Sequence, residues 1–199
     1  MTKIKEEFYE RSDILLIAQE LLGKVLLTNF QGQLTSGIIV ETEAYEGLTD
    51  KASHAYGGKK TNRTITMYES GGVAYVYLCY GIHHLFNIVT NKEKIPHAIL
   101  IRAIEPIDGL PIMLKRRNKK NKNFKLTSGP GSMTKAMGIT MSNSGESLMN
   151  DLIWLEDQNI NIKNDIISSP RVGIPYAEED IINPWRFRIQ DNPWTSSPN

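Results

Sequence analysis

Two pairs of strand-like segments, each joined by a short glycine-containing turn, limit this chain to folds that contain antiparallel β-sheet. The first pair comprises residues 24–28 and 35–45, with Gln31-Gly32-Gln33 between them. The second comprises residues 73–80 and 84–90, and its turn places a hairpin tip near Tyr80 and Gly81. Short turns join antiparallel neighbours, whereas parallel strands need long crossovers. We therefore expect a sheet built mainly from hairpins.

Helices are expected around this sheet. An amphipathic pattern predicts a helix over residues 8–23, with Ser12 or Asp13 as its cap. Further helices are predicted over residues 109–117 and from the segment 128–132 through Met137, and further strands over residues 97–104, 152–155, 171–174 and 185–189. No repeat or linker divides the chain, so residues 1–199 are expected to form one α+β domain with peripheral helices and a protruding β-hairpin. Residues 192–199 are expected to be a loose tail.

The composition is that of an ordinary globular protein. Hydrophobic residues make up 40% of the 199 residues and charged residues 23%, which excludes disorder across the whole chain. Cys79 is the single cysteine, so no internal disulfide and no Cys-ligated metal site can form. The N-terminal residues lack the apolar stretch of a signal peptide, and no apolar run approaches the roughly 18 residues of a transmembrane helix. We expect a cytoplasmic protein without a membrane partner.

Charge is distributed unevenly along the chain. The formal net charge is only +1, which alone would argue against a nucleic-acid partner. Residues 109–145, however, contain eight lysines and arginines and no acid, which leaves the remainder with 15 bases and 22 acids. A solvated, disordered loop would explain the lysines of residues 115–125 equally well. A local basic surface therefore stays possible despite the balanced total.

A carboxylate cluster follows an apolar run in one of the predicted strands. Residues two apart share a face of a strand, so Glu41, Glu43 and Tyr45 point the same way. A carboxylate that is partly desolvated beside an aromatic ring can deprotonate a water or stabilise a developing cation. The alternative is a strand end with solvated glutamates, since charged side chains mostly lie at the surface.

Tyrosines are concentrated in the second predicted hairpin. Tyr75 and Tyr77 share one face, while Tyr80 lies beside the glycine turn. Aromatic rings stack on unpaired bases, and an exposed ring can fill the space that a displaced base leaves. Core packing is the simpler explanation for Tyr75, but it fits a residue at a turn less well.

Other candidates carry weaker signals. His83 and His84 face opposite sides of a strand and lack further converging ligands, so no metal site is expected. The segment from Ser128 to Ser132 precedes a helix and could present N–H groups to a phosphate, although it lacks the end of a nucleotide P-loop. Arg102 lies within an apolar strand and needs a carboxylate or phosphate partner.

Taken together, these stretches resemble the alkyladenine (3-methyladenine) DNA glycosylases of the single-domain type. The matching segments occur in family order and cover nearly everything from Phe8 to Trp194. They are residues 40–45, His54, residues 74–82 with Asn87, residues 100–106, residues 128–131, residues 171–173 and residues 192–194. Each segment is weak alone, but seven in register are specific.

The resemblance implies a role for each matched position. Glu43 would be the general base that holds the attacking water, and Arg102 with the backbone carbonyl of Val172 would help to position that water. The remaining implied roles concern the base and the DNA: Tyr45, His54 and Tyr77 would surround the flipped base, Asn87 would disfavour guanine, and Tyr80 would enter the minor groove.

The resemblance also implies double-stranded DNA with a damaged purine as the partner. Candidate lesions are 3-methyladenine, hypoxanthine and etheno-adenine, and the enzyme would act as a monomer without a cofactor. No lysine lies among the matched pocket residues, so strand cleavage through a Schiff base is not expected. DNA phosphate contacts are expected at four positions: Arg63, Ser128, Gly131 and Lys135.

Two other functions remain open from the residues alone. A non-catalytic nucleic-acid-binding module would use the tyrosines and the basic segment, but it would not require Glu43, Arg102 and His54 together. A small-molecule hydrolase would show no salt-dependent affinity for DNA. The residues do not identify the acid that would protonate a neutral leaving base.

Overall fold

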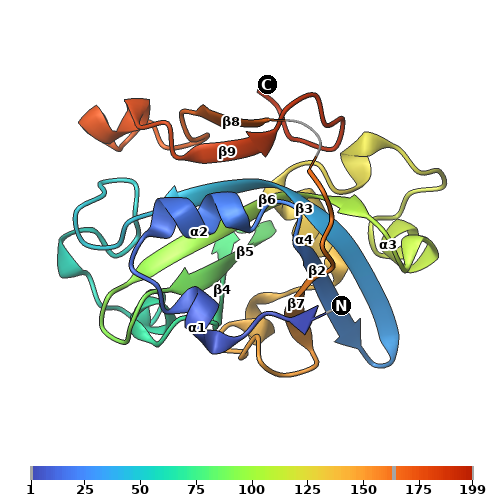
Figure 1. Cartoon of the computed structure of the whole chain (residues 1–199), viewed down its shortest axis with the longest axis horizontal. Helices are drawn as coiled ribbons and strands as arrows, with labels where there is room; N and C mark the ends of the chain where they lie inside the picture. The colour runs from blue at the N-terminus through green and yellow to red at the C-terminus, as the bar shows by residue number, and fades with distance from the viewer. Residues whose placement is uncertain (1, 163–164, 199) are drawn as a thin grey trace.

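The computed structural model describes residues 2–162 and 165–198, which contain a nine-stranded, mostly antiparallel sheet (Figure 1). The main strand order is β1-β7-β2-β3-β6-β5-β4, and β9 pairs with both β3 and β8. The strands are β1 (Thr2–Lys3), β2 (Val25–Phe30), β3 (Gln33–Tyr45), β4 (Ala74–Cys79), β5 (His83–Thr90), β6 (His97–Pro106), β7 (Ile153–Asp157), β8 (Ile166–Ser169) and β9 (Arg186–Ile189). The α+β class predicted from the sequence is confirmed.

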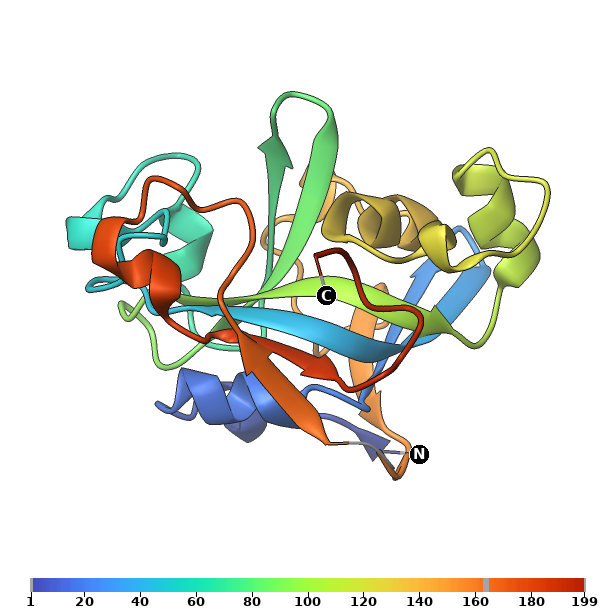
Figure 2. The ribbon, with the colours of Figure 1, turned by 90° about the horizontal axis from the view of Figure 1, so that it is seen from above.

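Short helices cover both faces of the central strands. The helices are α1 (Glu6–Tyr9), α2 (Ile14–Glu20), α3 (Leu110–Arg116) and α4 (Pro130–Met137), with 3₁₀ turns η1 (Tyr56–Gly58), η2 (Ile65–Tyr68), η3 (Phe124–Leu126), η4 (Met141–Asn143) and η5 (Glu178–Ile182). In Figure 2, α1 and α2 lie on one side of β3 and β6, and α3 and α4 lie on the other. No helix among the described residues is long and apolar enough to cross a bilayer.

Both predicted hairpins form. Gln31 and Gly32 have φ values of 56° and 74°, which is the left-handed pair that a two-residue hairpin turn between β2 and β3 requires. The pairing of β4 with β5 runs from Ala74↔Ile88 to Cys79↔His83. Figure 2 shows this second hairpin rising well clear of the body of the molecule. The expected protruding hairpin is therefore confirmed.

Three expectations need correction. The helix predicted over residues 8–23 is two helices, because Asp13 accepts a hydrogen bond from the Leu16 N–H (2.9 Å) and so caps a new helix there. Residues 171–174 form an irregular loop instead of a strand, and β8 was missed. The tail is not loose at Trp194 and Ser196, which are only 4% exposed because each packs into the protein body.

A double irregularity in strand pairing lies at the centre of the sheet. Ile39 pairs with Ile104, Glu41 with Ala103, and Thr42 with Ile101, so Val40 on β3 and Arg102 on β6 are extra residues in the ladder. Bulges of this kind redirect side chains and are frequent beside active sites. They place Arg102 against the acidic face of β3.

Candidate active site

Glu43 is fully buried on β3, directly behind the wall of a pocket of about 710 Å³. Its Oε1 accepts hydrogen bonds from the Val172 N–H (2.8 Å) and pairs with the Arg102 guanidinium (3.1 Å). Its Oε2 accepts from the Tyr45 hydroxyl (2.8 Å). All three partners line the pocket and all three donate, so Glu43 acts as an acceptor-only carboxylate at the pocket wall. Oε2 keeps one lone-pair site for a further donor.

Tyr45 remains a neutral phenol in this arrangement. Burial, followed by the nearby Glu43 carboxylate, holds the pKa of Tyr45 well above its usual value. A neutral hydroxyl can donate to Glu43, whereas a phenolate would repel it. The sequence prediction that Glu43 and Tyr45 share a face is consistent with this contact.

Arg102 connects Glu43 to a second buried carboxylate, Glu41. The Arg102 Nε donates to Glu41 Oε1 (2.7 Å), and the Arg186 Nε from β9 donates to the same oxygen (2.7 Å). Two carboxylates and two guanidinium groups thus form one charge-balanced, solvent-excluded cluster. The free-energy penalty for removing such charges from water is offset only when every charge is paired, as it is here. The predicted carboxylate partner of Arg102 is present.

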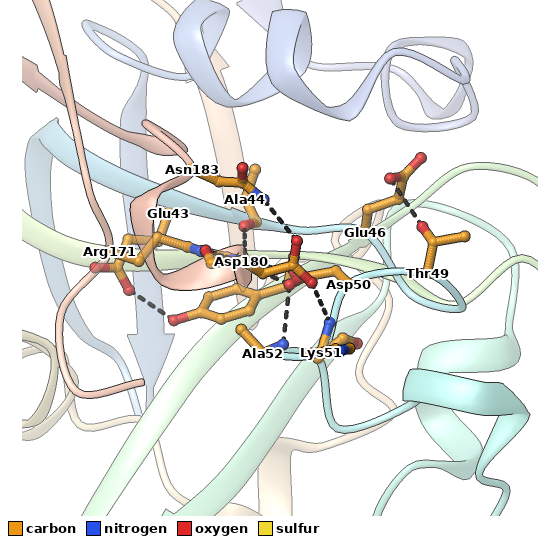
Figure 3. Close-up of polar contacts among 12 residues, drawn as sticks. Glu43, Ala44, Glu46, Thr49, Asp50, Lys51, Ala52, Arg171, Asp180 and Asn183 are labelled. Atoms are coloured by element: carbon orange, nitrogen blue, oxygen red, sulfur yellow. Dashed lines mark hydrogen bonds and ion pairs between the residues drawn. The ribbon is translucent and has the colours of Figure 1, made fainter. Parts of the chain in front are cut away.

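The loop that carries Val172 is fixed by its neighbour, Arg171. The Arg171 guanidinium forms a two-point ion pair with the fully buried Asp50 side chain (2.5 and 2.8 Å) and donates to the Ala44 carbonyl (2.9 Å). Its central carbon lies over the rings of Tyr45 (4.8 Å) and Trp185 (4.9 Å). Figure 3 shows Arg171, Asp50 and Ala44 gathered beside Glu43. This clamp sets the position of the Val172 N–H.

Aromatic side chains make up much of the pocket lining. The His54 and Tyr77 rings are perpendicular at 4.5 Å between centroids, and the Tyr75 and Tyr77 rings are tilted at 5.6 Å. Tyr45 and Tyr77 both line the pocket, together with the rings of His54, Tyr56, Tyr75, Tyr80 and Tyr176. Tyr75 is only 2% exposed and packs in a small apolar cluster, which confirms the core-packing explanation for that residue.

His54 is held as a neutral imidazole of one tautomer. Its Nε2 lies 3.0 Å from an Arg63 nitrogen, and its Nδ1 lies 2.9 Å from the Tyr75 hydroxyl. Arginine only donates, so Nε2 accepts and the proton resides on Nδ1. Burial and then the Arg63 charge lower the pKa of His54 to about 4. At neutral pH this side chain therefore carries no positive charge into the pocket.

Asn87, on β5, is nearly buried and lines the pocket. It is 3% exposed, and its side-chain amide donates to the Tyr75 carbonyl at 3.1 Å. This bond orients the side chain toward the hairpin backbone, while the residue still lines the pocket. Asn87 is therefore placed to contact a ring that enters beside Tyr77.

Tyr80 lies at the hairpin tip, at the edge of the same pocket. It is 88% exposed and adopts a φ of 49°, a left-handed conformation that is uncommon for tyrosine. The neighbouring Ile82 is 71% exposed. Two large apolar side chains at the end of a projecting hairpin indicate a surface that contacts another molecule.

The four residues expected to contact DNA phosphates lie in different environments. Arg63 points into the pocket, with its guanidinium 4.8 Å from the Tyr77 ring centroid. Ser128 pairs with Ala103 on β6, and Gly131 packs so closely on His83 that a Cβ would lie 2.9 Å from that ring. Lys135 is exposed in the last turn of α4. Gly131 thus supports the hairpin, and the phosphate contacts stay predictions.

Residues to which the sequence patterns assigned no role complete the site. They share full or nearly full burial and a charged or hydroxyl group, and they are Asp50, Arg171, Arg186 and Ser196. The alternation of Arg186-Phe187-Arg188-Ile189 could have indicated inward-facing arginines in β9. Among the residues described, no three His, Cys, Asp or Glu side chains gather as a metal site.

A fixed carboxylate lies behind an aromatic pocket and next to an exposed aromatic hairpin, an arrangement that suits an enzyme acting on a planar ring. The family model of Methylpurine-DNA glycosylase (MPG) matches residues 7–193. The chain therefore belongs to the methylpurine-DNA glycosylase family, as the sequence resemblance indicated, and is a DNA-repair hydrolase of N-glycosyl bonds whose partner is DNA.

Relatives from distant bacteria match over nearly the whole chain. A protein of Chlamydia felis named "Putative 3-methyladenine DNA glycosylase" is 48% identical over 187 residues, which cover 94% of this chain and 95% of the relative. Proteins of the same name from Clostridium tetani and Bacillus cereus (strain B4264) are 47% and 45% identical over 201 and 198 residues, with at least 95% of either chain covered. The residues matched by the family model include all those that line the pocket, from Tyr45 to Tyr176.

Proposed function

We propose that this enzyme removes 3-methyladenine from double-stranded DNA, with Glu43 as the general base. The observation that carries the proposal is the full burial of Glu43, with three fixed donors from Val172, Arg102 and Tyr45 around it. A preorganised carboxylate needs no rearrangement when positive charge develops in the transition state. The name of the curated relatives supports 3-methyladenine as the lesion.

In the proposed reaction the damaged base leaves the helix and enters the pocket. Tyr45 and Tyr77 stack on its faces, which returns about 1–3 kcal/mol per base and offsets a few kcal/mol of unstacking. Tyr80 occupies the space left in the duplex, since its ring is exposed at the tip of the hairpin. Asn87 contacts the base edge and disfavours the 2-amino group of guanine.

The chemical step is hydrolysis. A water oxygen forms a bond to C1′ of the deoxyribose, the bond from C1′ to the base nitrogen breaks with its electron pair going to the base, and Glu43 takes the water proton. Arg102 and the backbone carbonyl of Val172 position the water, and the negative charge of Glu43 stabilises the oxocarbenium character at C1′. An N3-alkylated adenine carries a positive charge and leaves as a neutral molecule without an acid.

Excision of a neutral damaged base requires an acid in addition to the general base. Hypoxanthine and etheno-adenine stay candidates whose leaving base needs a proton. His54 is an unsuitable source of that proton at neutral pH, because burial and Arg63 lower the pKa of His54 to about 4.

Monomeric state and cytoplasmic location also stay predictions. A non-catalytic binding module is disfavoured by membership in a family of hydrolases.

Single-turnover base release tests the proposal. Glu43→Gln keeps the shape and the acceptor oxygen of the side chain but removes the base, so we expect release of 3-methyladenine from alkylated duplex DNA to fall about 10²- to 10⁴-fold. Affinity for the same duplex should change little, because the pocket walls and the hairpin are retained. Release by Glu43→Gln at the wild-type rate would show that another group activates the water.

A further inference from the structure

The C-terminal strap, defined here as residues 192–198, lies against the buried charge cluster rather than extending into solvent. Trp194 is 4% exposed, and its ring lies edge-on to Phe124 at 5.2 Å between centroids. The Arg186 guanidinium donates to the carbonyls of Ser196 (2.7 Å) and Pro198 (2.6 Å). In Figure 2 the strap passes in front of β3 and β6, the strands that carry Glu43 and Arg102. A segment far along the chain thus reaches the catalytic strands.

Ser196 is buried and makes three hydrogen bonds with the charge cluster. Its backbone N–H donates to Glu41 Oε2 (2.6 Å), and its hydroxyl donates to Glu41 Oε1 (2.9 Å). The same hydroxyl accepts from the Arg102 Nη2 (3.0 Å). The hydroxyl is therefore both donor and acceptor between the carboxylate and the guanidinium, which is a role that alanine cannot fill.

These contacts determine how Arg102 meets the catalytic carboxylate. Arg102 uses Nε for Glu41 (2.7 Å) and Nη2 for Ser196 (3.0 Å), so only Nη1 reaches Glu43, at 3.1 Å. Arginine and carboxylate otherwise favour a two-point pair with parallel hydrogen bonds. A second Arg102 bond to Glu43 would occupy the free lone pair of Oε2, which the attacking water needs.

We propose that Ser196 is a positioning residue that keeps the Arg102 side chain in a one-point contact with Glu43, so that the carboxylate stays open to water. The strap therefore completes the active site from the far end of the chain. The inference rests on the proposed role of Glu43. It assigns Ser196 no contact with the substrate or with the reacting atoms.

The test compares two neighbouring serines on the strap. Ser196→Ala removes the buried hydroxyl, whereas the control Ser197→Ala removes an exposed hydroxyl one residue further on. We expect Ser196→Ala to slow single-turnover release of 3-methyladenine about ten- to a hundredfold, the scale of a small misplacement of a catalytic group. Affinity for a duplex with a tetrahydrofuran abasic-site analogue should stay within about twofold of the control. A general destabilisation of the fold would reduce both the rate and the affinity, so a slower rate with unchanged affinity distinguishes positioning from destabilisation.

Each variant is then combined with Glu43→Gln. If Ser196 acts through Glu43, Ser196→Ala should slow release no further in the Glu43→Gln background. Equal slowing in both backgrounds, a rate equal to that of Ser197→Ala, or a parallel loss of melting temperature and DNA affinity would each overturn the positioning role. A wild-type rate for Glu43→Gln alone would instead overturn the proposed function, so the two failures are distinguishable.

Discussion

The buried charge cluster behind the pocket wall (Glu41, Glu43, Arg102 and Arg186), called the floor below, and the hairpin tip (Tyr80 to Ile82) are built in opposite ways. At the floor, Glu41 and Glu43 are fully buried, and each carboxylate oxygen accepts at least one hydrogen bond from a fixed donor. At the tip, Tyr80 is 88% exposed and Ile82 is 71% exposed. The floor thus satisfies its polar groups within the protein, while the tip leaves apolar area for a partner.

This difference predicts different consequences for substitutions in the buried cluster and at the exposed tip. A buried charge network has two discrete states, paired or broken, so changes there should appear as large losses of stability or rate. An exposed side chain contributes only when the partner is present, so changes there should alter binding and leave folding unaffected. A substitution in the buried cluster that altered only DNA binding, or a substitution at the tip that destabilised the fold, would contradict this distinction.

The largest effect on stability is expected from the floor, at Glu41. Glu41→Gln would remove the carboxylate to which the Arg186 Nε donates and would leave Arg102 with Glu43 as its carboxylate partner, since both arginines donate to the same Glu41 oxygen. Breaking a buried pair in this way costs about 3–5 kcal/mol. Urea unfolding would measure the loss, with Glu20→Gln in the half-exposed pair with Arg11 as the control. A loss below about 1 kcal/mol, the value of a surface pair, would show that the cluster is not tightly coupled.

The second effect concerns the pocket wall and pH. Burial and then Arg63 lower the pKa of His54 from 6.5 to about 4, so the unfolded chain binds a proton that the native protein rejects. Stability therefore falls as the pH drops from about 6.5 toward 4, by about 3 kcal/mol, and is unaffected above that window. Thermal unfolding of wild type and His54→Gln should diverge in this window because the variant lacks the titrating group. Parallel curves would contradict the burial of a neutral His54.

The third prediction addresses the tip. Tyr80→Ala should weaken binding to lesion-containing duplex by about 1–3 kcal/mol, because the ring no longer fills the space of the flipped base. The free energy of unfolding should change by less than about 0.5 kcal/mol, as expected for an exposed side chain. Leu152→Ala, an exposed apolar change outside the pocket lining, serves as the control in both assays. A destabilised protein with unchanged lesion affinity would reverse the roles assigned to tip and floor.

Sequence patterns predicted the elements that depend on local chemistry. The two hairpins follow from glycine turns and alternation, and the pairing of Glu43 with Tyr45 follows from the two-residue period of a strand. The bulges at Val40 and Arg102 could not be predicted, because they depend on the register between two strands about 60 residues apart. The same holds for Ser196, whose burial depends on tertiary contacts with Glu41, and whose polar surroundings in the sequence suggested a loose tail.

The smallest effect is expected from the basic segment. Lys119 and Lys120 are exposed in the turn between α3 and η3, in a stretch that contains no acid. If they bind phosphates, Lys119→Gln with Lys120→Gln should weaken binding to undamaged duplex a few-fold and reduce the slope of log affinity against log salt by about 0.9 for each phosphate no longer neutralised. Lys92→Gln with Lys94→Gln serves as the control. Both are exposed lysines of the β5–β6 loop, so this variant removes the same charge outside the basic segment. Equal slopes for the two double variants would mean that net charge, rather than the basic segment between α3 and η3, determines the attraction to DNA.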